Sequence, residues 1–155
     1  MQGRVLVGCA LAAVLLTAGC SGGAPRNDAG QVTASATADA FEIKVGDCMG
    51  SLSDSGSSPV PLVPCNQAHY WEAYASIKMT GDTYPGETAI TTQAEKDCGT
   101  AFKAFVGVAP SDSDYSLTYY YPSQDSWEKG GDREILCIAG SASGGIKGSL
   151  KGVKK

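Results

Sequence analysis

The chain has 155 residues, 43% of them hydrophobic, and its 12 basic and 16 acidic side chains give a formal net charge of −4. This length accommodates one domain of ordinary size with some additional segments. We expect no nucleic-acid partner, because phosphates are neutralised by clustered Lys and Arg and this acidic chain has no dense basic run. The single histidine excludes sites that need several imidazoles.

Residues 1–19 predict a lipoprotein signal peptide. Arg4 supplies a positive start, and the 14 residues from Val5 to Ala18 are uncharged and rich in Leu, Val and Ala. As a helix this stretch is about 21 Å long, too short for a bilayer core of about 30 Å. It ends in LTAGC at residues 16–20, which resembles the bacterial lipobox. We therefore expect lipidation of Cys20 with acyl chains such as palmitate; an ordinary secretory signal is the alternative.

Lipidation at Cys20 implies a protein anchored to the extracytoplasmic face of the cell membrane, since two acyl chains make a stable anchor. Cleavage before Cys20 removes Arg4 and leaves 11 basic and 16 acidic side chains, a net charge of −5. Residues 20–40 contain no aromatic residue, and Val32 is their only large aliphatic one. This composition predicts a lipidated cysteine followed by a disordered tether. Twenty such residues have a root-mean-square reach of about 25 Å.

The folded domain is expected over residues 41–142. Residues 41–45 alternate apolar and polar side chains, as in a half-buried strand. Residues 60–63 are apolar but bracketed and interrupted by proline, which favours a strand at a sheet edge. A longer strand is predicted at residues 70–79.

Residues 87–106 give the strongest helix prediction. Apolar residues at spacings of three and four form one stripe: Ile90, Ala94, Cys98, Ala101, Phe102 and Phe105. Gly107 stands where a C-terminal cap belongs. Strands at 117–121 and 133–139 flank a short helical turn at 123–128, capped by Ser123. The expected fold is α+β, a small and mostly antiparallel sheet with one main helix packed on it. Residues 143–155, with four lysines, predict a flexible basic tail.

Four cysteines remain in the exported domain: Cys48, Cys65, Cys98 and Cys137. Disulfides persist in such a compartment, so we expect two of them. Spacing alone does not choose among the three connectivities. We favour Cys48–Cys65, which closes a local loop, with Cys98–Cys137, which joins the helix stripe to the most apolar strand. A zinc site is the rival interpretation, disfavoured because no C-x-x-C pair is present.

Three segments carry a resemblance to a known family: VGDC at residues 45–48, VPCNQAHYWE at 63–72 and SWEKGGDREILC at 126–137. Together they resemble the septum-formation domain family of actinobacterial envelope proteins. That family has a V-G-D-C opening, a V-P-C-x-x-x-H-x-x-E segment, a helix containing a cysteine and a W-x-x-G-D-R-x-x-x-C closing strand. The resemblance covers about residues 44–140. It implies an envelope location and a link to cell division, and it brings no agreed catalytic activity.

His69-x-x-Glu72 invites a catalytic or metal-binding interpretation, but zinc proteases need H-E-x-x-H on a helix. Here the segment alternates like a strand, on which residues three apart point to opposite faces. We expect His69 to hydrogen-bond a nearby loop or carboxylate. A ligand-binding role together with Trp71 is the alternative.

A second group of candidates follows the helix. Tyr119, Tyr120 and Trp127 belong to a local aromatic concentration that suits the docking of a protein partner or stacking on sugar rings. Arg133 lies between two acids, and we expect a turn in which Asp132 accepts backbone N–H bonds and Arg133 pairs with an acid. Anion binding by Arg133 is the alternative.

The expected domain, residues 41–142, lacks G-x-S-x-G and a phosphate-binding glycine loop, so we expect no enzyme, no cofactor and no metal. The interpretation is a membrane-anchored interaction module that binds an unknown envelope protein through the Tyr119–Trp127 region. The alternative is a binder of small ligands or cell-wall glycans that uses His69, Trp71 and Arg133. A hydrolase dependent on His69 is a weaker third hypothesis.

Overall fold

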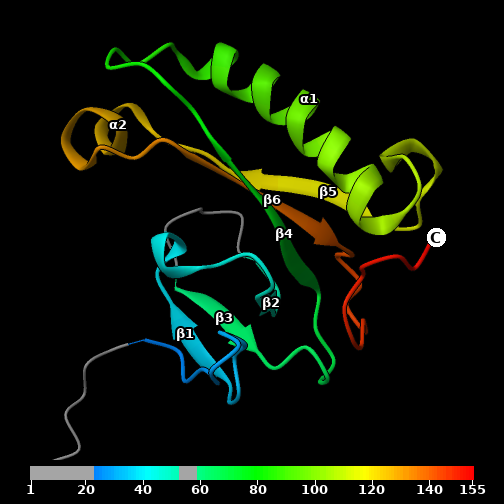
Figure 1. Ribbon diagram of the computed structural model, residues 1–155. Coiled ribbons are helices and arrows are strands. Elements are labelled where there is room, and N and C mark those ends of the chain that lie inside the picture. Colours follow the sequence, from blue (N-terminus) through cyan, green and yellow to red (C-terminus); the bar gives the residue numbers. More distant parts are fainter. Residues whose placement is uncertain (1–22, 53–58) are drawn as a thin grey trace, which may run out of the picture.

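The computed structural model describes residues 23–52 and 59–155 (Figure 1). The expected signal peptide and the expected lipidation site Cys20 lie outside the described residues. In the described part, an antiparallel sheet has the strand order β1-β3-β2-β4-β6-β5. Its strands are β1 Ala36–Ala38, β2 Cys48–Met49, β3 Val60–Val63, β4 Trp71–Lys78, β5 Ser116–Tyr120 and β6 Glu134–Gly140. The helices are α1 Glu87–Val106 and α2 Gln124–Gly130, with 3₁₀ turns η1 Ala40–Glu42 and η2 Pro110–Asp112.

Helix α1 packs across β4, β6 and β5 (Figure 1). It has the predicted bounds, and its buried residues recur every four positions: Ile90, Ala94, Cys98, Phe102 and Val106. The helix ends at Gly107, whose φ of 100° lies in the left-handed region and whose N–H donates to the carbonyl of Lys103. Glycine adopts that conformation without a Cβ clash, which explains the sharp stop.

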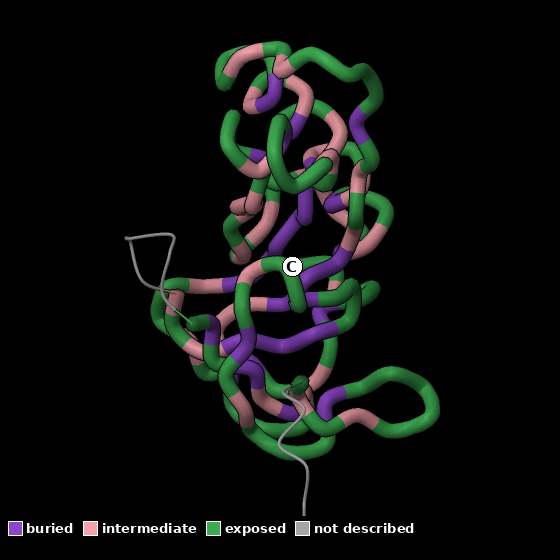
Figure 2. Tube along the Cα trace, turned by 90° about the vertical axis from the view of Figure 1, so that its left-hand side faces the viewer, coloured by how far each residue is buried: buried purple, intermediate pink, exposed green. Residues whose placement is uncertain are grey.

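A second buried cluster lies on the opposite face of β4 and β6. Ala73, Leu136 and Ile138 of these strands meet residues from the N-terminal part of the domain: Val32, Ala38, Ile43, Met49, Val60 and Leu62. Because β6 is covered on both faces, it is apolar along almost its whole length instead of alternating. Figure 2 shows buried segments through the middle of the molecule and exposed loops around them.

The prediction of a disordered tether up to residue 40 is wrong for residues 23–40. Residues 36–38 form β1, and Val32 and Ala38 are buried. Arg26 forms an isolated bridge with Val32 and an ion pair with Asp47. The composition argument failed because this segment needs no core of its own. Its few small apolar residues cover surface that later strands supply.

Two further strand predictions need correction. Residues 41–45 do not form a strand: Asp39 accepts the N–H of Phe41, and Glu42 completes a capping box that starts η1. Strand β3 has the predicted bounds but lies between β1 and β2, not at an edge. The sequence gives β1 no recognisable strand pattern, so the neighbour that covers β3 was missed.

The expected flexible tail at residues 143–155 is also wrong, because this segment folds back onto the domain. Ile146 pairs with His69 in an isolated bridge, and Leu150 is only 1% exposed. The N–H of Lys154 donates to the carbonyl of Val106. The four lysines remain exposed as expected, while backbone hydrogen bonds hold the segment between them to the domain.

Both disulfides have the favoured pairing. Cys48–Cys65 joins β2 to the residues after β3, and Cys98–Cys137 joins α1 to β6. Together with the antiparallel sheet and the main helix, they confirm the predicted α+β class with two bridges.

Candidate functional site

His69 is a structural residue in this fold. It is fully buried, and its Nδ1 lies 2.9 Å from the carbonyl oxygen of Gln67. A carbonyl only accepts hydrogen bonds, so Nδ1 is the donor in this contact. In the described part of the chain Nε2 has no hydrogen-bond partner. The ring therefore ties down the loop before β4, and it is not presented to a ligand at the surface.

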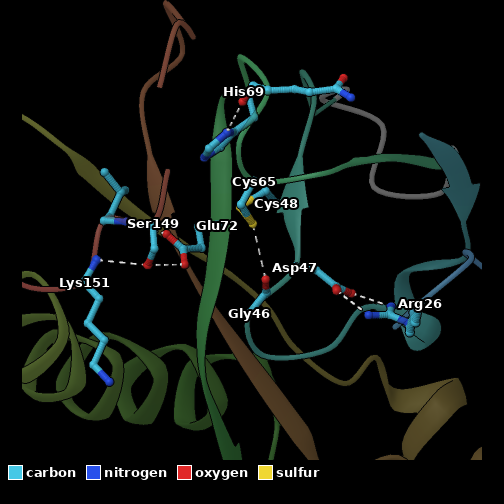
Figure 3. The surroundings of a disulfide bond; sticks show 11 residues. Arg26, Gly46, Asp47, Cys48, Cys65, His69, Glu72, Ser149 and Lys151 are labelled. Carbon is cyan, nitrogen blue, oxygen red and sulfur yellow. Dashed lines mark hydrogen bonds and ion pairs between the residues drawn. A yellow bond between two sulfur atoms is a disulfide. The ribbon is translucent and has the colours of Figure 1, made fainter. Parts of the chain in front are cut away.

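Glu72 anchors the C-terminal segment. Its carboxylate is buried and accepts the hydroxyl of Ser149 at 2.7 Å and the N–H of Leu150 at 2.6 Å (Figure 3). Among the described residues no hydrogen bond links Glu72 to His69. The two residues that invited a catalytic interpretation therefore have separate tasks, each fastening a different stretch of backbone.

Trp127 and Arg133 form an internal cluster instead of a binding surface. Trp127 is 1% exposed, and its indole N–H donates to the carbonyl of Asp82 at 3.0 Å. The guanidinium of Arg133 stacks on the indole at 3.8 Å and donates to the carbonyls of Gly81, Trp127 and Asp132. Asp132 accepts the N–H of Glu134, as expected, but the partners of Arg133 are carbonyls and not an acid. The Nε and Nη1 groups of Arg133 are therefore engaged by backbone carbonyls.

The remaining aromatic candidates divide between the two faces of the sheet. Tyr119 packs against the buried cluster beneath α1. Tyr120 and Trp71 pack against the second buried cluster, which lies on the opposite face of β4 and β6 and which we call the N-terminal cluster. Tyr119 and Tyr121 share a face and meet edge to face, with ring centroids 5.9 Å apart. Only Tyr121 of these is an exposed large hydrophobic side chain, at 37%.

Two hollows share Tyr121 and Ser123 in their linings, and we call this pair of hollows the aromatic groove. The first has a volume of about 220 Å³ and lies between η1, the end of β5, α2 and the start of β6. It is lined by Ala40, Phe41, Tyr120, Tyr121, Ser123, Ser126, Asp132, Glu134 and Leu136. The second, of about 360 Å³, is lined by Tyr84, Glu87, Tyr121, Ser123 and Gln124.

The aromatic groove combines exposed rings with negative charge. Phe41 is 72% exposed. Three carboxylates line the two hollows, those of Asp132, Glu134 and Glu87, and none of the described Lys or Arg side chains does. Glu87 accepts the hydroxyl of Tyr121 at 2.9 Å, and this bond, with burial, raises the pKa of that phenol. Such a surface suits a cation, because carboxylates attract it and aromatic faces stack on it.

Sequence reasoning found only one edge of this groove. Tyr120 was a candidate, but Phe41 was assigned to a strand, and Asp132 and Glu134 were considered only as neighbours of Arg133. Phe41 and Tyr121 are 80 positions apart in the chain, and no local pattern links them. The usable signal was the large apolar side chain of Phe41 next to Glu42 at the start of the domain.

A third hollow, of about 420 Å³, lies beside the Cys48–Cys65 bridge. Its lining consists of Asn27, Gln31, Val32, Thr33, Pro64, Cys65, Asn66 and Gln67, and contains no charged side chain. Over residues 23–52 and 59–155, no group of three or more His, Cys, Asp or Glu side chains is placed to hold a metal ion. None of the helices described is long and apolar enough to cross a membrane.

Comparison with known proteins places this chain in a family. The family model described as "Septum formation" matches residues 8–137. The chain is 28% identical over 109 residues to "Putative lipoprotein LppN" of Mycobacterium tuberculosis, and equally to the protein of that name in Mycobacterium bovis. Each match covers 67% of this chain but 59% of the relative, so the chain spans about three-fifths of the length of these relatives. No solved structure gives a significant match. Because the family model covers well over half of its length, the chain belongs to the septum formation family.

Proposed function

We propose that this protein is a lipid-anchored, extracytoplasmic binding module without catalytic activity, which uses the aromatic groove to hold a cationic segment of another envelope protein. The anchor is an acyl group on Cys20. Support for the anchor comes from the lipobox-like LTAGC segment and from the similarity to the mycobacterial protein named "Putative lipoprotein LppN".

The observation that carries the proposal is the composition of the groove. Phe41 and Tyr121 expose their rings beside the carboxylates of Asp132 and Glu134, with no cation in the lining. Lys78 pairs in register with Glu134 on β4 and β6, but among the described residues the two side chains form no ion pair. A Lys or Arg side chain entering the groove gains about 0.5–1 kcal/mol from an exposed aromatic face and up to about 1 kcal/mol from each exposed carboxylate.

A non-enzymatic role is supported by the state of the single imidazole. His69 is buried and bonded to a loop carbonyl, so it is not available to a substrate as a general base. Two of the three residues of the glycan-binding alternative have other roles, since His69 is buried and Arg133 donates to backbone carbonyls. The glycan-binding alternative is then that a sugar ring stacks on Phe41 or Tyr121, and this version is the one tested below.

Titration of the ¹⁵N-labelled chain with acetyl-tetralysine amide tests the groove. We expect amide shifts at Ser123, Ser126 and Asp132 with a Kd of about 1 mM, because a few weak contacts amount to about 4 kcal/mol. Raising the salt from 50 to 500 mM should weaken binding. Phe41→Ala and Glu134→Gln should each weaken it several-fold.

Glu128→Gln is the matched control, since it removes one exposed charge from α2 outside the groove lining. Acetyl-tetraglutamate amide is the control ligand. Shifts that are equal for both peptides, or that survive Glu134→Gln unchanged, would refute cation recognition. Shifts caused by peptidoglycan fragments but not by tetralysine would favour the glycan alternative.

Photo-crosslinking in the host identifies the class of partner. A benzophenone amino acid at position 121 should trap a protein, whereas the same group at position 66, in the third hollow, should not trap that protein. We further propose that this partner acts at division sites, which the family description supports. A fluorescent fusion distributed evenly around the envelope throughout the cell cycle would contradict that assignment.

A further inference from the structure

We infer that the domain stands directly on the membrane, with the end formed by residues 25–33 and 64–67 in contact with phospholipid headgroups. This inference rests on the proposed acylation of Cys20. It concerns a different surface from the aromatic groove.

The first step is an ion pair that fixes the N-terminal segment to the domain. Arg26 donates to both carboxylate oxygens of Asp47, at 2.5 and 2.7 Å (Figure 3). Asp47 is 1% exposed and also accepts the N–H of Lys44 at 2.8 Å. A bidentate pair with a buried carboxylate is costly to break, because separation leaves an unpaired charge inside the protein. The chain is therefore held to the domain at Arg26.

The second step is the compact turn that follows. The side-chain oxygen of Asn27 accepts the N–H groups of Ala29 and Gln31, and the N–H of Thr33 donates to the carbonyl of Pro25 at 2.9 Å. Val32 is buried in the N-terminal cluster. The folded domain thus begins at Pro25 and not at residue 41.

The third step is the reach that remains. Five peptide units separate Cys20 from Pro25, and in any conformation they span at most about 18 Å. A free segment of twenty residues would have allowed up to about 70 Å. The headgroup layer is itself about 6 Å thick on each side of the hydrocarbon, so it fills part of this distance of about 18 Å. If Cys20 is acylated, Pro25 is therefore confined to within about 18 Å of the lipid surface.

The surface at this end has a chemistry that suits hydrated headgroups. The third hollow opens between residues 27–33 and 64–67, and it presents the carboxamides of Gln31, Asn66 and Gln67 with the hydroxyl of Thr33. Carboxamides donate to phosphate and ester oxygens and accept from ammonium and water. Because no charged side chain lines the hollow and the exposed Asp28 beside it is acidic, we expect contact with zwitterionic lipids in preference to anionic ones.

This orientation also decides where the aromatic groove faces. In Figure 1, residues 23–35 lie at one end of the molecule, while α2 and the end of β5 lie toward the other. A domain that stands on residues 25–33 and 64–67 presents the groove away from the bilayer, where a cationic partner can reach it.

Hydrogen exchange on the full acylated chain in phosphatidylcholine nanodiscs tests the orientation, with the same protein in detergent as reference. Intact mass first establishes acylation. We expect amides of residues 27–33 and 64–67 to exchange more slowly in nanodiscs, by several-fold, and amides of α2 to be unchanged. A variant with fifteen Gly and Ser residues inserted after Gly23 should lose this difference, because it extends the reach without altering the fold.

The outcomes separate the inference from the proposed function. An acylated chain with no protection at either stretch, or with protection at α2, overturns the orientation and leaves the anchored binding module intact. Protection that persists in the insertion variant shows that the surface binds headgroups on its own, and overturns the argument from reach. A mass without acyl chains refutes the anchor itself, and the orientation with it.

Discussion

Trp127→Ala tests whether Trp127 is a core residue or part of a contact face. Trp127 is the largest fully buried side chain in the described part of the chain. Its ring meets Tyr84 edge to face at 6.0 Å and supports the guanidinium of Arg133 on its face. The sequence predicts a contact face at Tyr119–Trp127, and a residue of such a face can be truncated without harm to the fold. The structure predicts the opposite.

The size of the effect follows from what the alanine would remove. Replacing a buried Trp by Ala costs about 3–5 kcal/mol through lost burial and the cavity left behind. The carbonyl of Asp82 also loses its donor, worth about 1 kcal/mol, and Arg133 loses its stacking partner. These losses share one space, so we expect a total of about 4 kcal/mol, not their sum. The total free energy of unfolding of such a domain is about 5–15 kcal/mol.

Urea unfolding followed by far-UV circular dichroism, with both disulfides intact, measures the change in the free energy of unfolding. The melting temperature should fall by an amount on the order of 10 °C. Trp127→Phe keeps most of the packing and should cost about half as much. Tyr121→Ala is the surface control and should cost less than about 1 kcal/mol. A Trp127→Ala protein within 1 kcal/mol of the wild type would refute the assignment of Trp127 to the core.

Three further changes probe other parts of the fold. Glu72→Gln should lower the free energy of unfolding by about 2 kcal/mol, since a neutral amide with one accepting oxygen replaces a carboxylate that accepts from both Ser149 and Leu150; urea unfolding measures it. Gly140→Ala should cost about 3 kcal/mol in the same assay, because its Cβ would collide with the carbonyl of Tyr70. Burial raises the pKa of Tyr74, so the folded state keeps a proton that the unfolded state loses near pH 10. Stability should therefore fall above about pH 10, by up to about 1.4 kcal/mol per pH unit for this group, and Tyr74→Phe should flatten that decline.

The first two of these changes have a matched control. Glu128→Gln changes the same group on an exposed face and should leave stability within about 0.5 kcal/mol. Gly130→Ala meets nothing within 4 Å and should be neutral or slightly stabilising in a helix. Equal losses in variant and control, or an alkaline decline that Tyr74→Phe does not change, would contradict the respective argument.

The local part of the fold was predictable because it depends on neighbours in the chain. The spacing of apolar residues from Ile90 to Phe105, followed by Gly107, identified α1 with its observed bounds. Ser123 identified the start of α2, whose Ser126 N–H it accepts. The disulfide pairing followed from placing Cys98 on the helix stripe and Cys137 on the most apolar strand.

The segments at both ends were not predictable in this way. Val32 and Leu150 are isolated apolar residues among Gly, Ser and Lys, too few to indicate burial by composition. Val32 packs with residues of β2, β3, β4 and β6, and Leu150 packs with residues of α1, β4 and β6, all remote in sequence. Whether such a residue is buried depends on surface that another part of the chain provides.

The sequence by itself determined the α+β class, the main helix, the two bridges and membership of the septum formation family, because each follows from short-range periodicity, residue chemistry or ordered motifs. Only the tertiary structure decided which polar and aromatic residues are presented. It buries His69 and Trp127, and it engages the guanidinium of Arg133 with backbone carbonyls. It brings Phe41 and Tyr121 together at the surface. The physical reason is that the exposure of a side chain depends on which elements pack on each face of the sheet. The strand order places residues side by side that are far apart in the sequence, and no local sequence pattern predicts that.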